Sequence, residues 1–226
     1  MEQPEIETWG DFSSPFFLTR HPQPEVLNPV LSSLFLGLES EGETHRNPYK
    51  TPSNQEEIFE SSFELFKRPE PCIQQLKEFC MYGIWQAVAR TNGYSDEECR
   101  KMHVFTDAWF HITLFGGYIS NHTHPMAAWS AVYMVDPGEQ PEDHPQGGVL
   151  SFKDPRPHAN MYLDRGNNSW QRPYHVGSVN YAMKPGELMI FPSFLQHEVT
   201  PYFGRKPRIT VAMNCSFRES GVLKAG

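Results

Sequence analysis

Three histidines in this sequence are spaced so that they can bind one metal ion. His122 and His124 stand two positions apart, just before the apolar run AAWSAVYMV, and side chains two apart on an extended segment point to the same face. His197 ends a second strand-like segment, GELMIFPSFLQH. Three imidazoles brought together from two strands of one barrel form a facial set of ligands that suits Fe(II). We therefore predict an iron site made of His122, His124 and His197.

An arginine and a threonine further along the chain predict a dicarboxylate beside this metal. Along the segment RITVAMNC, strand alternation places Arg208, Thr210 and Asn214 on one face. A guanidinium binds a carboxylate through two parallel charge-assisted hydrogen bonds, and a neighbouring hydroxyl adds a third donor. If this face turns toward the iron, Arg208 and Thr210 hold a dicarboxylate cosubstrate there.

The overall charge and the apolar pattern argue against several kinds of partner. The chain has 226 residues and a net charge of −8 with no basic cluster, which argues against nucleic acid. No apolar run approaches the ~18 residues of a membrane span, and the opening MEQPEIETWG lacks the apolar core of a signal peptide. The four cysteines form no CxxC pair and are interpreted as reduced thiols. We expect a cytoplasmic protein that acts on a small molecule, with its oligomeric state left open.

From His103 onward the chain has the pattern of a small β-barrel or sandwich. Seven or eight short β-branched and aromatic runs are divided by turn signals such as DPG, QGG and KPG, which is typical of that architecture. Two long polar connections, residues 136–146 and 158–174, interrupt the runs. Long loops at a barrel mouth often shape substrate access.

The region before the barrel is predicted to contribute helices that brace one face of a sheet. Gln55 to Phe66 and Cys72 to Val88 repeat apolar residues at helical spacing, and Gly93 lies just past the second segment. Ser95 followed by Glu98 is a capping-box signature for a short third helix.

We predict two parts of the chain that pack together as one structural domain. Residues 1–102 form an N-terminal irregular segment with helices, and residues 103–226 form the catalytic barrel. Within residues 1–54 the only apolar island runs from Val26 to Leu38. It is predicted to be a strand or a short helix that begins at or after Pro29 and covers the barrel.

The ordered motifs resemble the Fe(II)/2-oxoglutarate-dependent dioxygenase superfamily. Most similar are its small 2-oxoglutarate–Fe(II) oxygenases, with an HxH motif, a later histidine and an RxT motif. The resemblance covers residues ~105–218, about half the chain, a length that fits one barrel. It implies a mainly β fold, a double-stranded β-helix (a jelly-roll or cupin-like barrel) braced by N-terminal α-helices. The matching residues, in order, are His122-Thr123-His124, Trp129 to Tyr133, Gly147 to Phe152, Asp154-Pro155-Arg156, Pro185 to Leu188, Phe191-Pro192-Ser193, His197, Arg208-Ile209-Thr210 and Asn214.

Carried over to this chain, the resemblance implies that His122 and His197 ligate iron. It further implies that Arg208 pairs with the distal carboxylate of 2-oxoglutarate, while Thr210 and Tyr133 hydrogen-bond to it. Most of the superfamily has aspartate or glutamate where this chain has His124.

Three interpretations of the third ligand position follow. His124 is the ligand, giving an all-imidazole set; or it turns away and water completes the site; or Asp154 or Asp136 reaches in. We favour the first. A histidine in place of a small residue also argues against a halogenase.

The resemblance implies an oxidoreductase that uses Fe(II), 2-oxoglutarate and O2. It would hydroxylate a small molecule while 2-oxoglutarate is decarboxylated to succinate. Two other functions stay open. One is a cupin-type three-histidine dioxygenase without 2-oxoglutarate, favoured by Gly116 six positions before His122, although that pattern explains neither Arg208 nor Thr210. The other is a non-catalytic ligand-binding barrel. Candidates for the pocket walls are Trp109, Trp129, Trp170, Arg156 and Arg172.

Overall fold

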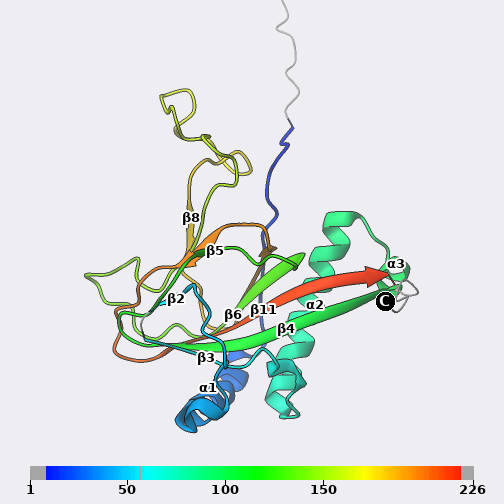
Figure 1. Ribbon diagram of the computed structural model, residues 1–226. Coiled ribbons are helices and arrows are strands. Elements are labelled where there is room, and N and C mark those ends of the chain that lie inside the picture. Colours follow the sequence, from blue (N-terminus) through cyan, green and yellow to red (C-terminus); the bar gives the residue numbers. More distant parts are fainter. Residues whose placement is uncertain (1–8, 56, 220–226) are drawn as a thin grey trace, which may run out of the picture.

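The computed structural model describes residues 9–55 and 57–219, which form two antiparallel β-sheets with helices on one side (Figure 1). The larger sheet has the strand order β1-β9-β6-β11-β4-β3 and the smaller sheet the order β2-β5-β10-β7-β8. The strands of the larger sheet are β1 (Phe17–Arg20), β9 (Glu187–Pro192), β6 (Trp129–Asp136), β11 (Arg208–Glu219), β4 (Met102–Thr113) and β3 (Ile58–Glu60). Those of the smaller sheet are β2 (Asn54–Gln55), β5 (Tyr118–His122), β10 (His197–Val199), β7 (Leu150–Phe152) and β8 (Val179–Tyr181). This is the predicted double-stranded β-helix, mainly β with few helices.

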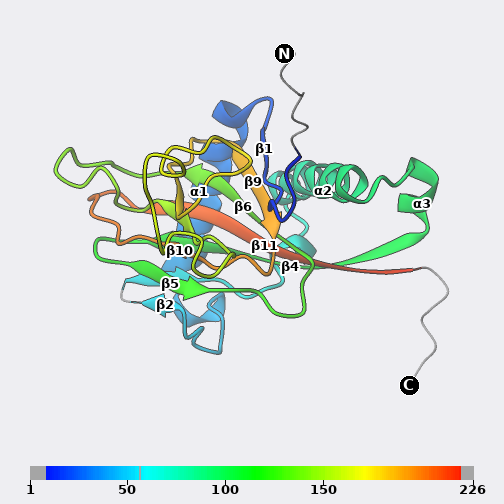
Figure 2. The ribbon, with the colours of Figure 1, turned by 90° about the horizontal axis from the view of Figure 1, so that it is seen from above.

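Two helices cover the outer face of the larger sheet, as Figure 2 shows from above. They are α1 (Pro24–Ser40) and α2 (Pro71–Asn92), and a short α3 (Asp96–Arg100) follows. Leu31 and Phe35 of α1 and Ile84 of α2 are fully buried in one cluster with Phe110 and Val211 of the sheet. Their burial is the main force that holds the helices on the sheet. The prediction that helices brace one face of the sheet is confirmed.

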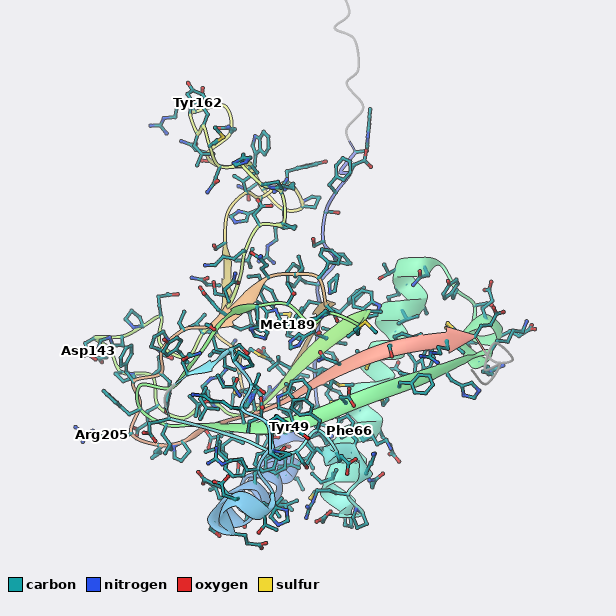
Figure 3. The ribbon with its side chains drawn as sticks, in the orientation of Figure 1. Tyr49, Phe66, Asp143, Tyr162, Met189 and Arg205 are labelled. Atoms are coloured by element: carbon teal, nitrogen blue, oxygen red, sulfur yellow. The ribbon has the colours of Figure 1, made fainter. Side chains whose placement is uncertain are left out.

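A second apolar cluster fills the space between the two sheets. Met134 and Met189 come from the larger sheet, and Leu150 and Phe152 come from the smaller sheet. Met189 is labelled in Figure 3, where it lies between the strands. Because successive side chains of a strand point to opposite faces, the residues next to Met134 on β6 point outward to the helices. This alternation decides which side chains can reach the barrel interior.

The predicted helix from Gln55 to Phe66 is wrong. The chain there forms the short strands β2 and β3, followed by a single 3-10 turn, η2 (Leu65–Lys67). Ile58 pairs with Thr113 and Phe59 with Ile112 of β4. The helix-like spacing of apolar residues is overridden because strand pairing with β4 satisfies the backbone groups of this segment.

Helices α2 and α3 agree with prediction, whereas α1 is longer than the predicted strand or short helix and begins earlier. Helix α2 spans the predicted Cys72–Val88 segment, and Gly93 caps it with a left-handed φ of 71°. Ser95 and Glu98 form the predicted capping box. Helix α1 begins at Pro24 and is 17 residues long, with Pro29 inside it. Pro24 is a favourable first residue because its missing N–H would have no helical partner there. A further 3-10 turn, η1 (Gly42–Thr44), follows α1. None of the helices that the structure describes is long and apolar enough to cross a membrane.

Candidate metal and cosubstrate site

The three predicted histidines meet at one end of the smaller sheet. His122 ends β5 and His197 begins β10, and the two are direct partners in the sheet register. His124 lies just past β5, where its backbone N–H donates to the carbonyl oxygen of Ser193 at 3.1 Å. The candidate ligand atoms of the three histidines all lie within 4.8 Å of one another. The structure therefore brings together all three residues that the sequence proposed as ligands.

Backbone carbonyls fix the proton position on two of these rings. The Nδ1 of His122 lies 2.8 Å from the carbonyl oxygen of Ser120, and the Nδ1 of His197 lies 2.9 Å from that of Leu195. A carbonyl oxygen can only accept, so each Nδ1 carries the proton and each Nε2 keeps a free lone pair. Metal-binding histidines in proteins usually donate their second ring N–H in this way.

The environment also keeps the imidazoles uncharged. Burial lowers the pKa of His122 below its usual 6.5. Burial, together with the charge of the neighbouring His122, lowers the pKa of His124 to about 4 and that of His197 to about 3. Because the rings are uncharged at neutral pH, metal binding does not have to remove the second proton of an imidazolium.

The histidines line a cavity of about 570 Å³ between the sheets. Arg208 and Thr210 of β11 line the same cavity, and both are 3% exposed. Burial lowers the pKa of Arg208 only to about 10, so the guanidinium is charged at neutral pH. Among residues 9–55 and 57–219, no carboxylate pairs with it. A buried guanidinium without a counter-ion is costly, and an anion in the cavity would remove that cost.

The expectation that Tyr133 binds the cosubstrate is wrong. Its side chain belongs to the cluster beneath the helices, and its hydroxyl donates to Oδ1 of Asn28 in α1 at 2.7 Å. Along β6, Val132 is among the residues that line the cavity, so alternation turns Tyr133 to the opposite face. The motif alone therefore did not show which face of β6 the side chain of Tyr133 occupies.

The two aspartates considered as third ligands lie outside the cavity. Asp136 ends β6 and accepts from the backbone N–H of Gly138 at 2.8 Å. Asp154 forms two hydrogen bonds with the guanidinium of Arg156, at 3.0 and 2.9 Å. Their carboxylates are therefore used in local structure.

The five candidates for the pocket walls separate into four environments. Trp109 lines the histidine cavity. Trp129 is buried beneath the helices, where its ring packs against Phe17. Arg156 and Arg172 line a separate cavity of about 350 Å³, and Trp170 is an exposed residue of the long loop. Figure 3 shows this loop standing away from the barrel, with Tyr162 near its tip.

A buried Glu60–His111 pair in the cavity wall was not expected from the sequence. The carboxylate of Glu60 lies 2.8 Å from Nε2 of His111 and accepts from Asn47 at 2.8 Å and Asn54 at 2.7 Å. Burial alone would raise the pKa of Glu60, but the hydrogen bond and charge of His111, helped by Thr51 and Asn47, lower it to about 2. Strand alternation could have placed His111 on the same face as Trp109 and Thr113. Glu60 was missed because residues Gln55–Phe66 were predicted to be a helix and not a strand beside His111.

Residues 107–214 match the protein family described as "Putative 2OG-Fe(II) oxygenase". No curated protein is similar enough in sequence to count as a relative. Among solved structures, a Pseudomonas putida prolyl-4-hydroxylase is similar with a TM-score of 0.56 and 19% identity, covering 91% of this chain and 93% of that one. A prolyl hydroxylase from Trichoplax adhaerens has a TM-score of 0.56 and 14% identity, covering 88% and 82%. The non-heme α-ketoglutarate-dependent epimerase SnoN of nogalamycin biosynthesis has a TM-score of 0.60 and 10% identity, covering 94% and 81%.

These structural likenesses show the shared fold, and the family match adds the chemistry. Enzymes of the matched family are oxidoreductases that use Fe(II), 2-oxoglutarate and O2. The match begins in β4 and ends in β11, and it includes His122, His197 and Arg208. Residues 107–214, which carry the candidate site, are therefore similar to the Fe(II)/2-oxoglutarate-dependent oxygenases.

Proposed function

We propose that this enzyme hydroxylates a small organic molecule at an iron held by His122, His124 and His197. Arg208 and Thr210 bind the distal carboxylate of 2-oxoglutarate, which is decarboxylated to succinate. The observation that carries the proposal is the buried guanidinium of Arg208, which pairs with no carboxylate of the described residues, in the same cavity as three neutral imidazoles. Such a cavity suits a metal ion together with a dianion, since the rings contribute no negative charge.

The donor set of this chain fits the iron and its cosubstrate. Bound iron, with 2-oxoglutarate and O2, supplies the oxidising power for C–H hydroxylation. The chain supplies orientation. The Nε2 atoms of His122 and His197 keep a free lone pair, because the Nδ1–H group of each ring donates a hydrogen bond to a backbone carbonyl. The guanidinium of Arg208 offers a planar pair of donors that matches a carboxylate. The two packed sheets keep bulk water away from the guanidinium.

A small substrate is supported by the size and lining of the cavity. About 570 Å³ lies within the range of small-molecule sites and exceeds what 2-oxoglutarate alone would fill. The residues that line the cavity include Tyr49, Phe63, Trp109 and Lys50. Aromatic faces beside a lysine suit a planar or apolar molecule that bears an acidic group. SnoN, which shares the fold, is recorded in complex with iron, α-ketoglutarate and a nogalamycin compound.

An anaerobic titration tests the proposal. Fe(II)-loaded protein is titrated with 2-oxoglutarate while the visible absorption spectrum is followed. A metal-to-ligand charge-transfer band is expected in the wild type. In Arg208→Met, far higher 2-oxoglutarate concentrations are expected to be needed to produce it. Arg205→Ala serves as the control, because Arg205 is exposed and lies at the periphery in Figure 3.

Two results would redirect the assignment. Iron that binds without any band on addition of 2-oxoglutarate would favour the three-histidine cupin dioxygenase. That enzyme class is the second candidate because no carboxylate joins the three histidines in the cluster that the described residues form. Absence of stoichiometric iron binding would favour the non-catalytic barrel.

A further inference from the structure

A chain of three polar side chains leads from the barrel interior to His124. The Oγ atoms of Ser193 and Ser130 lie 2.7 Å apart, and Ser130 Oγ lies 2.7 Å from Oδ1 of Asn214. The amide Nδ2 of Asn214 lies 3.2 Å from Nδ1 of His124. The sheet holds this chain in place, since Asn214 of β11 is the direct register partner of Ser130 of β6. Ser130 and Ser193 are 2% and 0% exposed, so each polar group there depends on the others.

The partner of Nδ1 decides whether His124 can bind a metal ion. A neutral imidazole binds through Nε2 only when its proton is on Nδ1, which then must donate a hydrogen bond. At His122 and His197 a backbone carbonyl accepts that proton. At His124 the partner is a side-chain amide. An N–H group facing Nδ1 would leave the proton on Nε2 and block the metal, whereas an amide oxygen would free Nε2.

A half-turn of the Asn214 amide exchanges its oxygen and nitrogen while every other atom stays in place. With the nitrogen facing His124, Ser193 donates to Ser130 and Ser130 donates to Asn214. With the oxygen facing His124, all three donations reverse: His124 Nδ1–H to Asn214, the Asn214 amide N–H to Ser130, and Ser130 to Ser193. A hydroxyl can donate or accept, so these hydrogen bonds are kept in either direction. The chain can therefore accommodate both proton positions on His124.

We propose that Asn214 is a positioning residue that makes His124 the third metal ligand. In the metal-bound protein its amide oxygen accepts the Nδ1 proton of His124, and Ser130 and Ser193 hold the amide in that orientation. The inference rests on the proposed function, because it requires a metal ion at the three histidines. It explains how a ring whose Nδ1 faces no backbone carbonyl is given the same proton position as its two neighbours.

Two substitutions at one position separate the possible roles. In Asn214→Asp the carboxylate can only accept a hydrogen bond, which fixes the proton of His124 on Nδ1. In Asn214→Leu the side chain has a similar size but can neither donate nor accept a hydrogen bond. Metal affinity is measured anaerobically with Fe(II), and with Zn(II), in competition with a chelator. We expect Asn214→Leu to bind about 10- to 100-fold more weakly and Asn214→Asp to bind at least as tightly as the wild type. Ser130→Ala should weaken binding several-fold, because the amide N–H loses its acceptor.

A matched control and a tautomer measurement complete the test. Asn180→Leu changes an exposed asparagine of β8, outside the cavity, and should bind metal like the wild type. In Zn(II)-loaded protein labelled with ¹⁵N-histidine, long-range ¹H–¹⁵N correlations should show the His124 proton on Nδ1. A proton on Nε2 would overturn the proposal.

The same titrations distinguish this inference from the function on which it rests. Asn214→Leu that binds metal like the wild type, or Asn214→Asp that is weakened as much as Asn214→Leu, refutes the role of Asn214. If His197→Ala meanwhile loses the metal, the site itself stands. Retention of metal in His197→Ala refutes the proposed function as well. If Asn214→Leu does not fold, the comparison of Asn214→Asp with Ser130→Ala decides, because only the second should weaken binding.

Discussion

Replacing Arg208 by methionine should separate cosubstrate binding from metal binding. The guanidinium lies buried in the cavity and no carboxylate among the described residues pairs with it. Removing one partner of a desolvated, hydrogen-bonded charge pair costs about 2–5 kcal/mol. This corresponds to a dissociation constant for 2-oxoglutarate that rises by about 30- to 5,000-fold. Iron affinity should change little, because methionine fills a similar volume and the three histidines stay in place.

Thermal unfolding measures the same effect without relying on turnover. At 2-oxoglutarate concentrations of about 100 times its dissociation constant, the wild type gains about 2.7 kcal/mol. For a chain of this size that gain raises Tm by about 5–10 °C. At the same concentration Arg208→Met should gain less than about 1 kcal/mol, which limits its shift in Tm to less than about 4 °C. Arg205→Ala should shift like the wild type.

The ligand-free protein provides a further check on this reasoning. Because Arg208 is a buried charge with no counter-ion among residues 9–55 and 57–219, its replacement by methionine should leave the ligand-free protein as stable as the wild type or more so. A large loss of stability in Arg208→Met would mean that the guanidinium is needed to hold the fold. A 2-oxoglutarate shift that persists in the variant would mean that the carboxylate is bound elsewhere. Either result refutes the assignment of Arg208.

Three further results follow from the structure. His197→Ala should abolish stoichiometric iron binding, measured by metal analysis after desalting, and retained iron would contradict the site. Tyr133→Phe should leave the affinity for 2-oxoglutarate unchanged yet cost about 1–3 kcal/mol in urea unfolding, because Oδ1 of Asn28 loses its donor. The pKa of Glu60 is about 2 in the folded state, below its ordinary 4.5, so its contribution of about 3 kcal/mol is complete above pH ~4.5 and is lost as pH falls through ~2. Glu60→Gln should therefore show a flatter loss of stability between pH 5 and 2 than the wild type, and parallel curves would contradict this role.

The parts of the site that sequence predicted well are those for which spacing alone determines position. His122 is followed two residues later by His124, and Arg208 by Thr210, so each pair shares a direction whatever the rest of the fold does. Helix α2 was predictable for the same reason, since its apolar period is regular and Gly93 ends it. Spacing along the chain is enough to predict a structure when all the residues concerned lie on one helix or one strand.

The failures come from contacts between distant elements. Tyr133 lies on a correctly predicted strand, but its face depends on the register with β11 and β9, which a single sequence does not reveal. Ile58 and Phe59 are spaced as in a helix, yet pairing with β4 makes them a strand. The polar chain from Ser193 to Asn214 joins strands β6 and β11 to the turn that follows β9, and no spacing rule connects them.

The strand pairing at the sheet margins gives the N-terminal region a role separate from the chemistry. Residues 107–214 match the enzyme family. Three strands of the N-terminal region lie outside that range, and each pairs with a strand of the barrel: β1 with β9, β2 with β5 and β3 with β4. A fragment restricted to the matching residues would present three uncovered strand edges. Open edges are templates on which other copies of a chain can add strands and aggregate. We therefore expect the residues before the barrel to protect the core from self-association, and a shortened form should be limited by solubility before it is limited by catalysis.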